Sequence, residues 1–340
     1  MPGKYEAVHR HEVLRGPGDA RPTGMEILQD EDRLSGDLSD KIVIITGCSS
    51  GLGVSTAQAM AATGATIYCT ARALDRAREA LGPLLDSPKV HLLEMDLASL
   101  ASVKAFADEF RSRESKLNIL INNAGVMFIP TNTKTADGFE MHIGTNHFAH
   151  FYLFALLKDL LLAGSTPEFQ SRVVNLSSSG HRYCPEQFDD INLEKKYDIM
   201  VAYGSSKSAN IHMANQIERL YGSQGIHGYS VMPGGIYTPL QKHIQAEMES
   251  VRASSTYSPW MRSLEQGCAT TVWAATAREL EGKGGVYCEN CAVAVEAPEG
   301  LDEAGLGRLQ YGYAKWAYNQ EMEERLWKMS LEAVGLKDGF

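Results

Sequence analysis

A glycine-rich turn between a buried strand and a helix constrains this fold more than any other feature of the sequence. Residues 42–45 are an unbroken β-branched run, which is typical of a strand covered on both faces. The sequence TGCSSGLG (46–53) follows directly, and an alanine-rich helical stretch, 54–63, comes next. This order directs bare backbone N–H groups and the positive end of a helix toward a pyrophosphate. It predicts a dinucleotide site, although a tight strand–helix turn without a ligand has the same pattern.

The alternation of strands and helices continues along the chain. Further strands are expected at 65–70, 90–95, 117–122, 172–176 and 226–232, with 285–294 as a seventh. Helical stretches are expected at 74–85, 99–112, 137–162 and around Tyr203. Such alternation implies parallel βαβ units with right-handed crossovers, which bring the carboxyl ends of the strands to one edge. The predicted fold class is therefore α/β, a single doubly wound Rossmann-type domain with a seven-stranded, mainly parallel sheet flanked by helices.

Both ends of the chain are expected to be additions to this domain. Residues 1–40 are rich in charge and in proline–glycine turns, so we expect an N-terminal extension that lies over the domain or is partly disordered. Residues 41–295 form the predicted dinucleotide-binding catalytic domain. Residues 296–340 are expected to be a C-terminal helical extension packed on the same domain. Its aromatic side chains can cover the active site, form a subunit contact or, in the interpretation we favour, be buried in the domain's own packing.

Charge and composition limit the partners. A formal net charge of −10 over 340 residues argues against a nucleic-acid or anionic-membrane surface. No apolar run approaches the roughly 18 residues of a membrane span. The N-terminus lacks the apolar core of a secretory signal, so the expected location is cytoplasmic. Six cysteines in such a chain favour reduced thiols over a disulfide framework.

No metal site is predicted. Cys288 and Cys291 form a lone C-x-x-C pair, and zinc would need two further ligands. Two thiols on a buried strand are therefore the simpler interpretation. His147 and His150 lie three residues apart without an acidic partner at ligand spacing, so we interpret them as packing or polar-network histidines.

A tyrosine and a lysine four residues apart carry the predicted chemistry. Tyr203 and Lys207 lie on one face of a helix, one turn apart. A nearby ammonium favours the phenolate, so we expect Lys207 to lower the pKa of Tyr203 from its free value of about 10. Such a phenol exchanges protons with an alcohol or carbonyl oxygen near neutral pH. Tyr311 and Lys315 have the same spacing, but they follow the last predicted strand and no serine-bearing one.

Polar residues follow other strands at the same edge. Arg72 stands where an NAD-preferring site usually has a carboxylate, and its guanidinium suits the 2′-phosphate of NADP, although a surface arginine would look the same. Asp96 can accept a hydrogen bond from adenine or cap the next helix. Ser178 can bind a substrate carbonyl or belong to a serine-rich turn. Asn146 interrupts an apolar helix, which needs a reason such as a water site or a kink. Thr238 and its backbone neighbours can hold a nicotinamide amide.

In this order the motifs resemble the short-chain dehydrogenase/reductase family, and within it the retinol-dehydrogenase and WW-domain-oxidoreductase branch, especially its fungal enzymes. The resemblance is carried by TGCSSGLG (46–53), NNAG (122–125), TNHFAHF (145–151), VVNLSSSGHR (173–182), YGSSK (203–207) and PGGIYT (233–238). It covers the chain from Lys41 to Ala294. The chain departs from many members in the spacing of Ser178 and Tyr203, which is about twice the usual one because of an insertion at 181–201.

The resemblance implies a catalytic tetrad. Asn146 would hold a proton-relay water, Ser178 would bind the reacting oxygen, Tyr203 would be the acid/base, and Lys207 would hold the nicotinamide ribose and tune the tyrosine. It also implies contacts with NADP(H) from Gly47, Ser49, Ser50, Gly51, Leu52, Gly53, Arg72, Asp96, Leu97, Asn123, Ala124, Gly125, Tyr203, Lys207, Pro233, Gly234, Ile236 and Thr238.

The predicted function is reversible hydride transfer between NADP(H) and a carbonyl/alcohol pair on a hydrophobic small molecule, with a secondary metabolite as one candidate. Residues 237–262 are expected to form a mobile substrate lid. One alternative is a catalytically silent NADP(H)-binding regulator or scaffold, which would bind cofactor tightly without turnover. Another is a cofactor-assisted isomerase or cyclase, which would form product without net consumption of cofactor. The resemblance also allows a homodimer or a homotetramer.

Overall fold

A mainly parallel sheet organises the chain. In the residues that the computed structural model describes, 3–34, 36–298 and 311–337, this sheet has eight strands in the order β10-β9-β6-β5-β4-β1-β2-β3. Neighbouring strands are parallel except for β9 and β10. The strands are β1 Ile42–Thr46, β2 Thr66–Ala71, β3 Val90–Glu94, β4 Ile119–Asn122, β5 Ser171–Leu176, β6 Ile226–Met232, β9 Val286–Glu289 and β10 Ala292–Val293.

The predicted seventh strand divides into two. β9 continues the parallel sheet beside β6, and Asn290 and Cys291 then adopt left-handed backbone conformations, with φ of 57° and 55°. This turn reverses the chain, so β10 pairs antiparallel with β9. Cys291 therefore lies in the turn, and only Cys288 lies on the buried strand. The prediction of a doubly wound, mainly parallel sheet is confirmed, with one strand more than expected.

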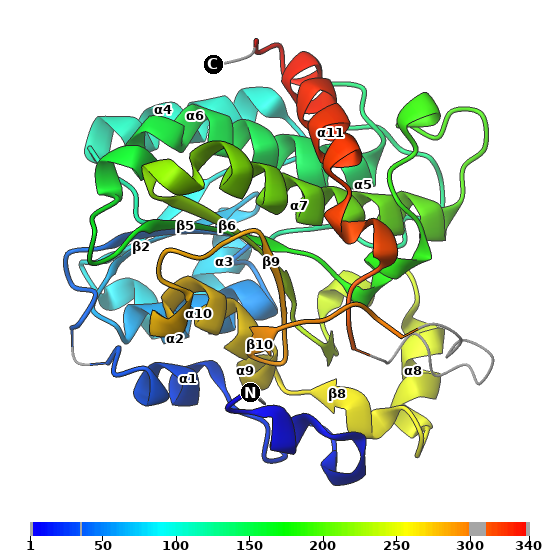
Figure 1. Cartoon of the computed structure of the whole chain (residues 1–340), viewed down its shortest axis with the longest axis horizontal. Helices are drawn as coiled ribbons and strands as arrows, with labels where there is room; N and C mark the ends of the chain where they lie inside the picture. The colour runs from blue at the N-terminus through cyan, green and yellow to red at the C-terminus, as the bar shows by residue number, and fades with distance from the viewer. Residues whose placement is uncertain (1–2, 35, 299–310, 338–340) are drawn as a thin grey trace.

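Helices cover both faces of the sheet (Figure 1). On one face α4, α6 and α7 enclose a core that includes Ile42 and Ile44, and on the other α2, α3 and α10 enclose a core that includes Val43 and Ile45. Because successive side chains of β1 enter opposite cores, all of its residues are apolar or buried, as the unbroken run predicted. The helices are α2 Leu52–Ala61, α3 Leu74–Leu81, α4 Leu100–Arg113, α5 Met141–Ile143, α6 Ala149–Gly164, α7 Ile199–Tyr221, α9 Leu264–Gly267 and α10 Ala269–Thr276.

Both extensions pack on this domain. In the N-terminal extension α1 (Gly24–Asp30) packs against α10 and α2, and in the C-terminal one α11 (Gln320–Ala333) packs against α7. Trp327 of α11 is buried with its ring edge-on to Phe151, while Tyr318 is exposed. The domain boundaries at residues 40 and 295 stay a prediction, and part of 296–340 lies outside the described residues. Among the described helices, none is both long and apolar enough to cross a membrane.

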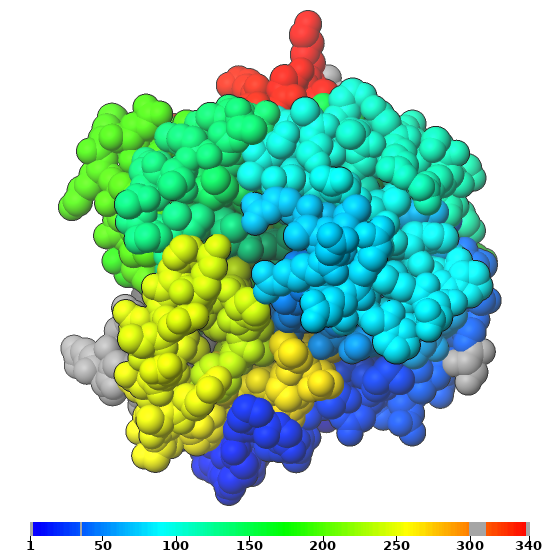
Figure 2. All heavy atoms as spheres, turned by 180° about the vertical axis from the view of Figure 1, so that it is seen from behind, coloured from blue at the N-terminus to red at the C-terminus, as the bar shows by residue number. Residues whose placement is uncertain are grey.

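The predicted lid segment (residues 237–262) leaves the domain through a two-stranded neck. β7 (Gly235–Ile236) and β8 (Met261–Arg262) pair in parallel, and the chain between them carries the short helix α8 (Gln245–Ala253). The segment is the yellow part of the surface in Figure 2. There it borders a recess whose other side is the blue-to-cyan surface of the chain that follows β2.

Candidate active site

The glycine-rich turn after β1 forms a cradle at the edge of the sheet. Gly47 and Gly51 have positive φ, 79° and 65°, which favours glycine at both positions. A Cβ at Gly53 would overlap the carbonyl oxygen of Gly47 and lie 2.8 Å from Asn123 Nδ2. The turn leads into the first turn of α2, which begins at Leu52, so backbone N–H groups face the edge between β1 and β4 where the strand order reverses. These residues fit a pyrophosphate.

The motif after β4 is fixed to this turn. Asn123 Nδ2 donates to the carbonyl oxygen of Thr46 (2.8 Å), and the backbone N–H of Ala124 donates to Thr46 Oγ1 (2.9 Å). The Thr46 hydroxyl is then free to donate to His150 Nε2 (2.9 Å), whose Nδ1 donates to the carbonyl oxygen of Asn146 (3.0 Å). Burial lowers the pKa of His150 to about 4, so its ring is neutral. The prediction that His150 belongs to a polar network is confirmed.

Residues predicted to contact the rest of a dinucleotide lie along the same edge. Arg72 follows β2 directly, is exposed, and has no ion-pair partner within the described ranges. Asp96 Oδ1 accepts from the backbone N–H of Ala98 (3.0 Å), and Ser99 caps α4. The alternative of Asp96 as the helix cap is therefore wrong. Thr238 approaches the glycine turn from the other side, with its methyl group 3.4 Å from the position of a Cβ on Gly51.

Tyr203 lies in a closely packed site on α7. Asp198 caps this helix by accepting from two backbone N–H groups, and Tyr203 follows one turn later with its side chain almost fully buried. The ring of Phe128 packs against it edge-on at 5.1 Å between centroids. A Cβ on Gly180 would lie 2.9 Å from the ring, so glycine is needed beneath it. Ser178 accepts from the backbone N–H of Gly180 (3.1 Å), and its hydroxyl oxygen would lie 3.4 Å from the same Cβ, next to the Tyr203 ring.

Lys207 lies close to Tyr203, yet the pKa of Tyr203 is raised and not lowered. Its ammonium donates to the carbonyl oxygen of Leu176 (2.9 Å) and lies 5.8 Å from the centre of the Tyr203 ring. Burial raises the pKa of Tyr203 to about 12, and the neighbouring Ser178 hydroxyl opposes this only in part. Burial also lowers the pKa of Lys207 to about 8. The predicted lowering of the Tyr203 pKa below its free value is therefore wrong, because burial of the phenol raises this pKa.

Asn146 lies in an irregular turn of the helix that contains it. Residues Gly144–Phe148 form a π-helical turn between α5 and α6, so the asparagine lies in an irregular part of the helix. Asn146 Oδ1 accepts from the backbone N–H of Val126 (2.8 Å), and its Nδ2 donates to Val126 O (3.1 Å) and to Ser206 Oγ (2.9 Å). The side-chain amide thus joins the chain after β4 to the helix that carries Tyr203.

The structure brings the predicted tetrad together. A Cβ on Gly180 would touch both the Tyr203 ring and Ser178 Oγ, and a Cβ on Gly125 would lie 3.1 Å from Asn146 Oδ1 and 3.5 Å from Lys207 Nζ. Tyr311, of the pair set aside above, instead donates to the carbonyl oxygen of His9 (3.2 Å). The relay-water role of Asn146 and the ribose role of Lys207 stay predictions.

Two supporting contacts were missed by the sequence reasoning. His181 Nδ1 donates to the carbonyl oxygen of Ser178 (2.6 Å), and its Nε2 accepts from the backbone N–H of Ala314 (3.0 Å) in the C-terminal extension. His212 of α7 pairs with Glu186 of the insertion (2.7 Å) and also donates to Trp316 O (2.8 Å). The position of His181, three residues after Ser178, was the available sequence signal for its contacts. No spacing in the sequence indicated the contacts of His212.

Comparison with known proteins identifies the family. Residues 41–249 match the model of short chain dehydrogenases. The chain belongs to the short-chain dehydrogenase/reductase family. It is 45% identical over 337 residues to the short-chain dehydrogenase/reductase prx1 of Penicillium roqueforti, covering 99% of this chain and 96% of the relative. The predicted family is thereby confirmed.

Relatives in both predicted subgroups support the branch. Human retinol dehydrogenase 12 is 34% identical over 308 residues, 90% of each chain, and chicken WW domain-containing oxidoreductase is 37% identical over 297 residues, 84% of this chain and 69% of the relative. The fold resembles the crystal structure of an uncharacterized protein from Mycobacterium paratuberculosis, with a TM-score of 0.65, 27% identity and coverage of 88% and 95%.

Proposed function

We propose that this family member is an NADP(H)-dependent oxidoreductase that interconverts a carbonyl and an alcohol on a hydrophobic small molecule, with a secondary metabolite as one candidate. The proposal rests on one observation. The phenol of Tyr203 and the hydroxyl of Ser178 lie side by side just beyond the carboxyl end of β5, on the edge that carries the glycine cradle. A hydroxyl pair placed there can hold a reacting oxygen beside a dinucleotide.

The cofactor would be held by the edge residues already described. The turn Gly47, Ser49, Ser50, Gly51, Leu52 and Gly53 would bind the pyrophosphate, and the exposed guanidinium of Arg72 would bind a 2′-phosphate. The adenine and nicotinamide ends would lie against Asp96, Leu97, Asn123, Ala124, Gly125, Lys207, Pro233, Gly234, Ile236 and Thr238. When bound, NADPH supplies the hydride.

The side chains of the site would then move the proton. Because the pKa of Tyr203 is about 12, its phenol stays protonated at neutral pH and acts as the acid when a carbonyl is reduced. Ser178 would turn its hydroxyl to the same oxygen and stabilise the charge that develops there. Lys207, whose pKa is about 8, would stabilise the phenolate left on Tyr203, and a water on Asn146 would return the proton.

An assay of the purified full chain tests this function. NADPH oxidation is followed with phenanthrenequinone and all-trans-retinal as apolar carbonyls, and products are identified by mass. The proposal expects loss of NADPH together with a product that carries two more hydrogen atoms. Tight NADPH binding without turnover would support the silent regulator, and product without net cofactor consumption would support an isomerase or cyclase. A cytoplasmic location and a homodimer or homotetramer stay predictions.

A further inference from the structure

The lid segment depends on its neck for its position. Its helix α8 has no buried residue, so the helix itself contributes little to holding the segment on the domain. The β7–β8 ladder pairs only Gly235 with Met261 and Ile236 with Arg262. Arg262, which is buried, adds hydrogen bonds to the carbonyl oxygen of Pro233 (3.4 Å) and to Asn290 Oδ1. A two-residue ladder of this kind needs further support on its outer side.

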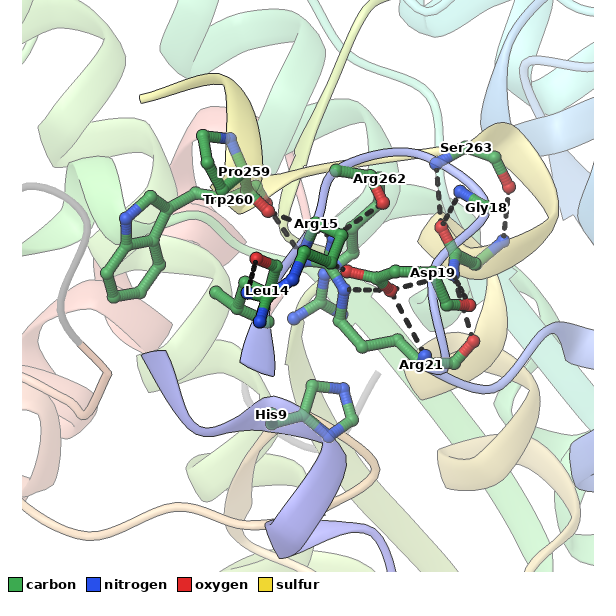
Figure 3. A network of polar contacts seen from close by, with 12 residues as sticks. His9, Leu14, Arg15, Gly18, Asp19, Arg21, Pro259, Trp260, Arg262 and Ser263 are labelled. Carbon is green, nitrogen blue, oxygen red and sulfur yellow. Dashed lines mark hydrogen bonds and ion pairs between the residues drawn. The ribbon is translucent and has the colours of Figure 1, made fainter. Parts of the chain in front are cut away.

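Arg21 of the N-terminal extension supplies that support (Figure 3). Its side chain is 0% exposed and reaches three successive carbonyl oxygens at the end of the lid segment. Nη1 donates to Trp260 O (3.0 Å), and Nη2 donates to Pro259 O (3.2 Å) and Met261 O (2.6 Å). One buried guanidinium thus fixes the path of the chain into β8, and hydrogen bonds from a charged donor are among the stronger ones in proteins.

The chain around Arg21 is itself held in place. Asp19 Oδ1 pairs with Arg21 Nε (2.8 Å), and both residues are buried at this contact. Gln266 Nε2 donates to the carbonyl oxygens of Asp19 and Arg21 (3.0 Å each), while its Oε1 accepts from the backbone N–H of Gly18 (2.9 Å). The ring of His11 stacks on Trp260, with 5.1 Å between centroids. Residues 11–21 therefore bridge the lid segment and α9.

We propose that residues 11–21 are a clamp that positions the substrate lid, and that Arg21 is the positioning residue. This inference rests on the proposed function, because it assumes that residues 237–262 cover a bound substrate. Arg21 touches no residue of the tetrad among the contacts described above. Its effect on the reaction would run through the closed position of the lid, so its loss should weaken substrate binding more than the chemical step.

Native-state proteolysis tests the clamp without any substrate. Lys242 and Arg252 are exposed trypsin sites within the lid segment. In the full chain, Arg21→Met should speed cleavage at these sites by about tenfold or more, which corresponds to about 1.4 kcal/mol in the opening equilibrium. Cleavage at the wild-type rate would overturn the proposal.

Arg33→Met is the matched control. Arg33 is also a buried arginine of the N-terminal extension, paired with Asp37 (2.7 Å) and donating to a core carbonyl, that of Thr276 (2.9 Å). It makes no contact with the lid segment among the described residues. Lid cleavage in this variant should stay within about twofold of wild type. Equal acceleration in both variants would show general destabilisation and overturn the clamp.

Two further measurements complete the test. Arg21→Lys serves as a second variant if Arg21→Met does not fold. It keeps the positive charge beside Asp19, but an ammonium cannot reach three carbonyl oxygens as the guanidinium does. Faster cleavage of the lid segment is again expected, and an unchanged cleavage rate would contradict the clamp. With NADPH and phenanthrenequinone, Arg21→Met should raise the quinone KM about fivefold or more while kcat stays within about twofold. Faster cleavage with an unchanged KM would overturn the lid-positioning role. No turnover by wild type would count against the proposed function, while trypsin would still test the clamp.

Discussion

The substitution Gly180→Ala, which adds a methyl group beneath the Tyr203 ring, tests whether packing sets the position of this phenol. A Cβ added at Gly180 would lie 2.9 Å from Tyr203 Cε1 and 3.1 Å from Cδ1. Ordinary contact between carbon atoms is about 3.5 to 4.0 Å, so Gly180→Ala must move the ring by about 0.6 Å or more. The ring cannot retreat freely, because it is buried and Phe128 packs on it.

The expected cost of this displacement is mainly catalytic. A misplacement of about 1 Å at a reacting group can lower the rate by about a hundredfold, so we expect Gly180→Ala to lower kcat by about tenfold to a hundredfold. NADPH binding should change by less than about twofold, because the cofactor cradle is formed by other residues. Overpacking should lower the free energy of unfolding by about 1 to 3 kcal/mol.

Three measurements check these effects. Steady-state reduction of phenanthrenequinone gives kcat, fluorescence gives the affinity for NADPH, and the melting temperature reports stability. Gly82→Ala is the control, since Gly82 has a positive φ of 49° and no atom within 4 Å of a new Cβ. Gly82→Ala should therefore lower the free energy of unfolding through backbone strain, by about 1 to 3 kcal/mol, without changing kcat. A folded Gly180→Ala protein with wild-type kcat would refute the reasoning that packing fixes the phenol where the reaction needs it.

Three other predictions follow from the site. Arg72→Ala should raise the KM for NADPH about tenfold or more and leave the KM for NADH nearly unchanged, because only NADPH carries the 2′-phosphate. The expected size follows from a hydrogen bond to a charged group, which is worth about 1.5 to 3 kcal/mol. Steady-state kinetics with both cofactors measure this difference. The rate of carbonyl reduction should fall as the pH rises through about 8, because Lys207 loses its proton there. Tyr203, with a pKa of about 12, stays protonated over the same range. A pH–rate profile checks this. Burial disfavours the charged form of His212, but the neighbouring Glu186 carboxylate raises the pKa of His212 above its ordinary value. The stability that this pair contributes is therefore fully present below about pH 6.5, the ordinary pKa of histidine. It is lost as the pH rises through the raised pKa of the folded state. Melting temperatures across this range should show that loss in wild type and not in Glu186→Gln.

Much of the fold could be predicted because its signals are local. The apolar run of β1 indicates a strand buried on both faces. The glycine turn that follows indicates a cradle, and this inference needs no knowledge of the helices around it. The division of the last segment into β9 and β10 was not predictable, because Asn290 and Cys291 form its turn without glycine, and a left-handed cysteine is unusual.

The electrostatics of the site could not be predicted from spacing alone. The four-residue interval places Lys207 beside Tyr203 correctly, but the pKa of the phenol depends on its burial, to which Phe128 and the close backbone at Gly180 contribute. These residues are 75 and 23 positions away from Tyr203 along the sequence. Likewise, nothing in the N-terminal sequence indicates that Arg21 binds carbonyls about 240 positions later.

The central claim is that Tyr203 gives a proton to the oxygen of a carbonyl substrate beside bound NADPH. The most direct test is Tyr203→Phe, which keeps the ring and removes only the hydroxyl. We expect kcat for carbonyl reduction to fall by about a hundredfold to ten-thousandfold while the Kd for NADPH stays within about twofold of wild type. A Tyr203→Phe enzyme that binds NADPH and still reduces the carbonyl at close to the wild-type rate would contradict it.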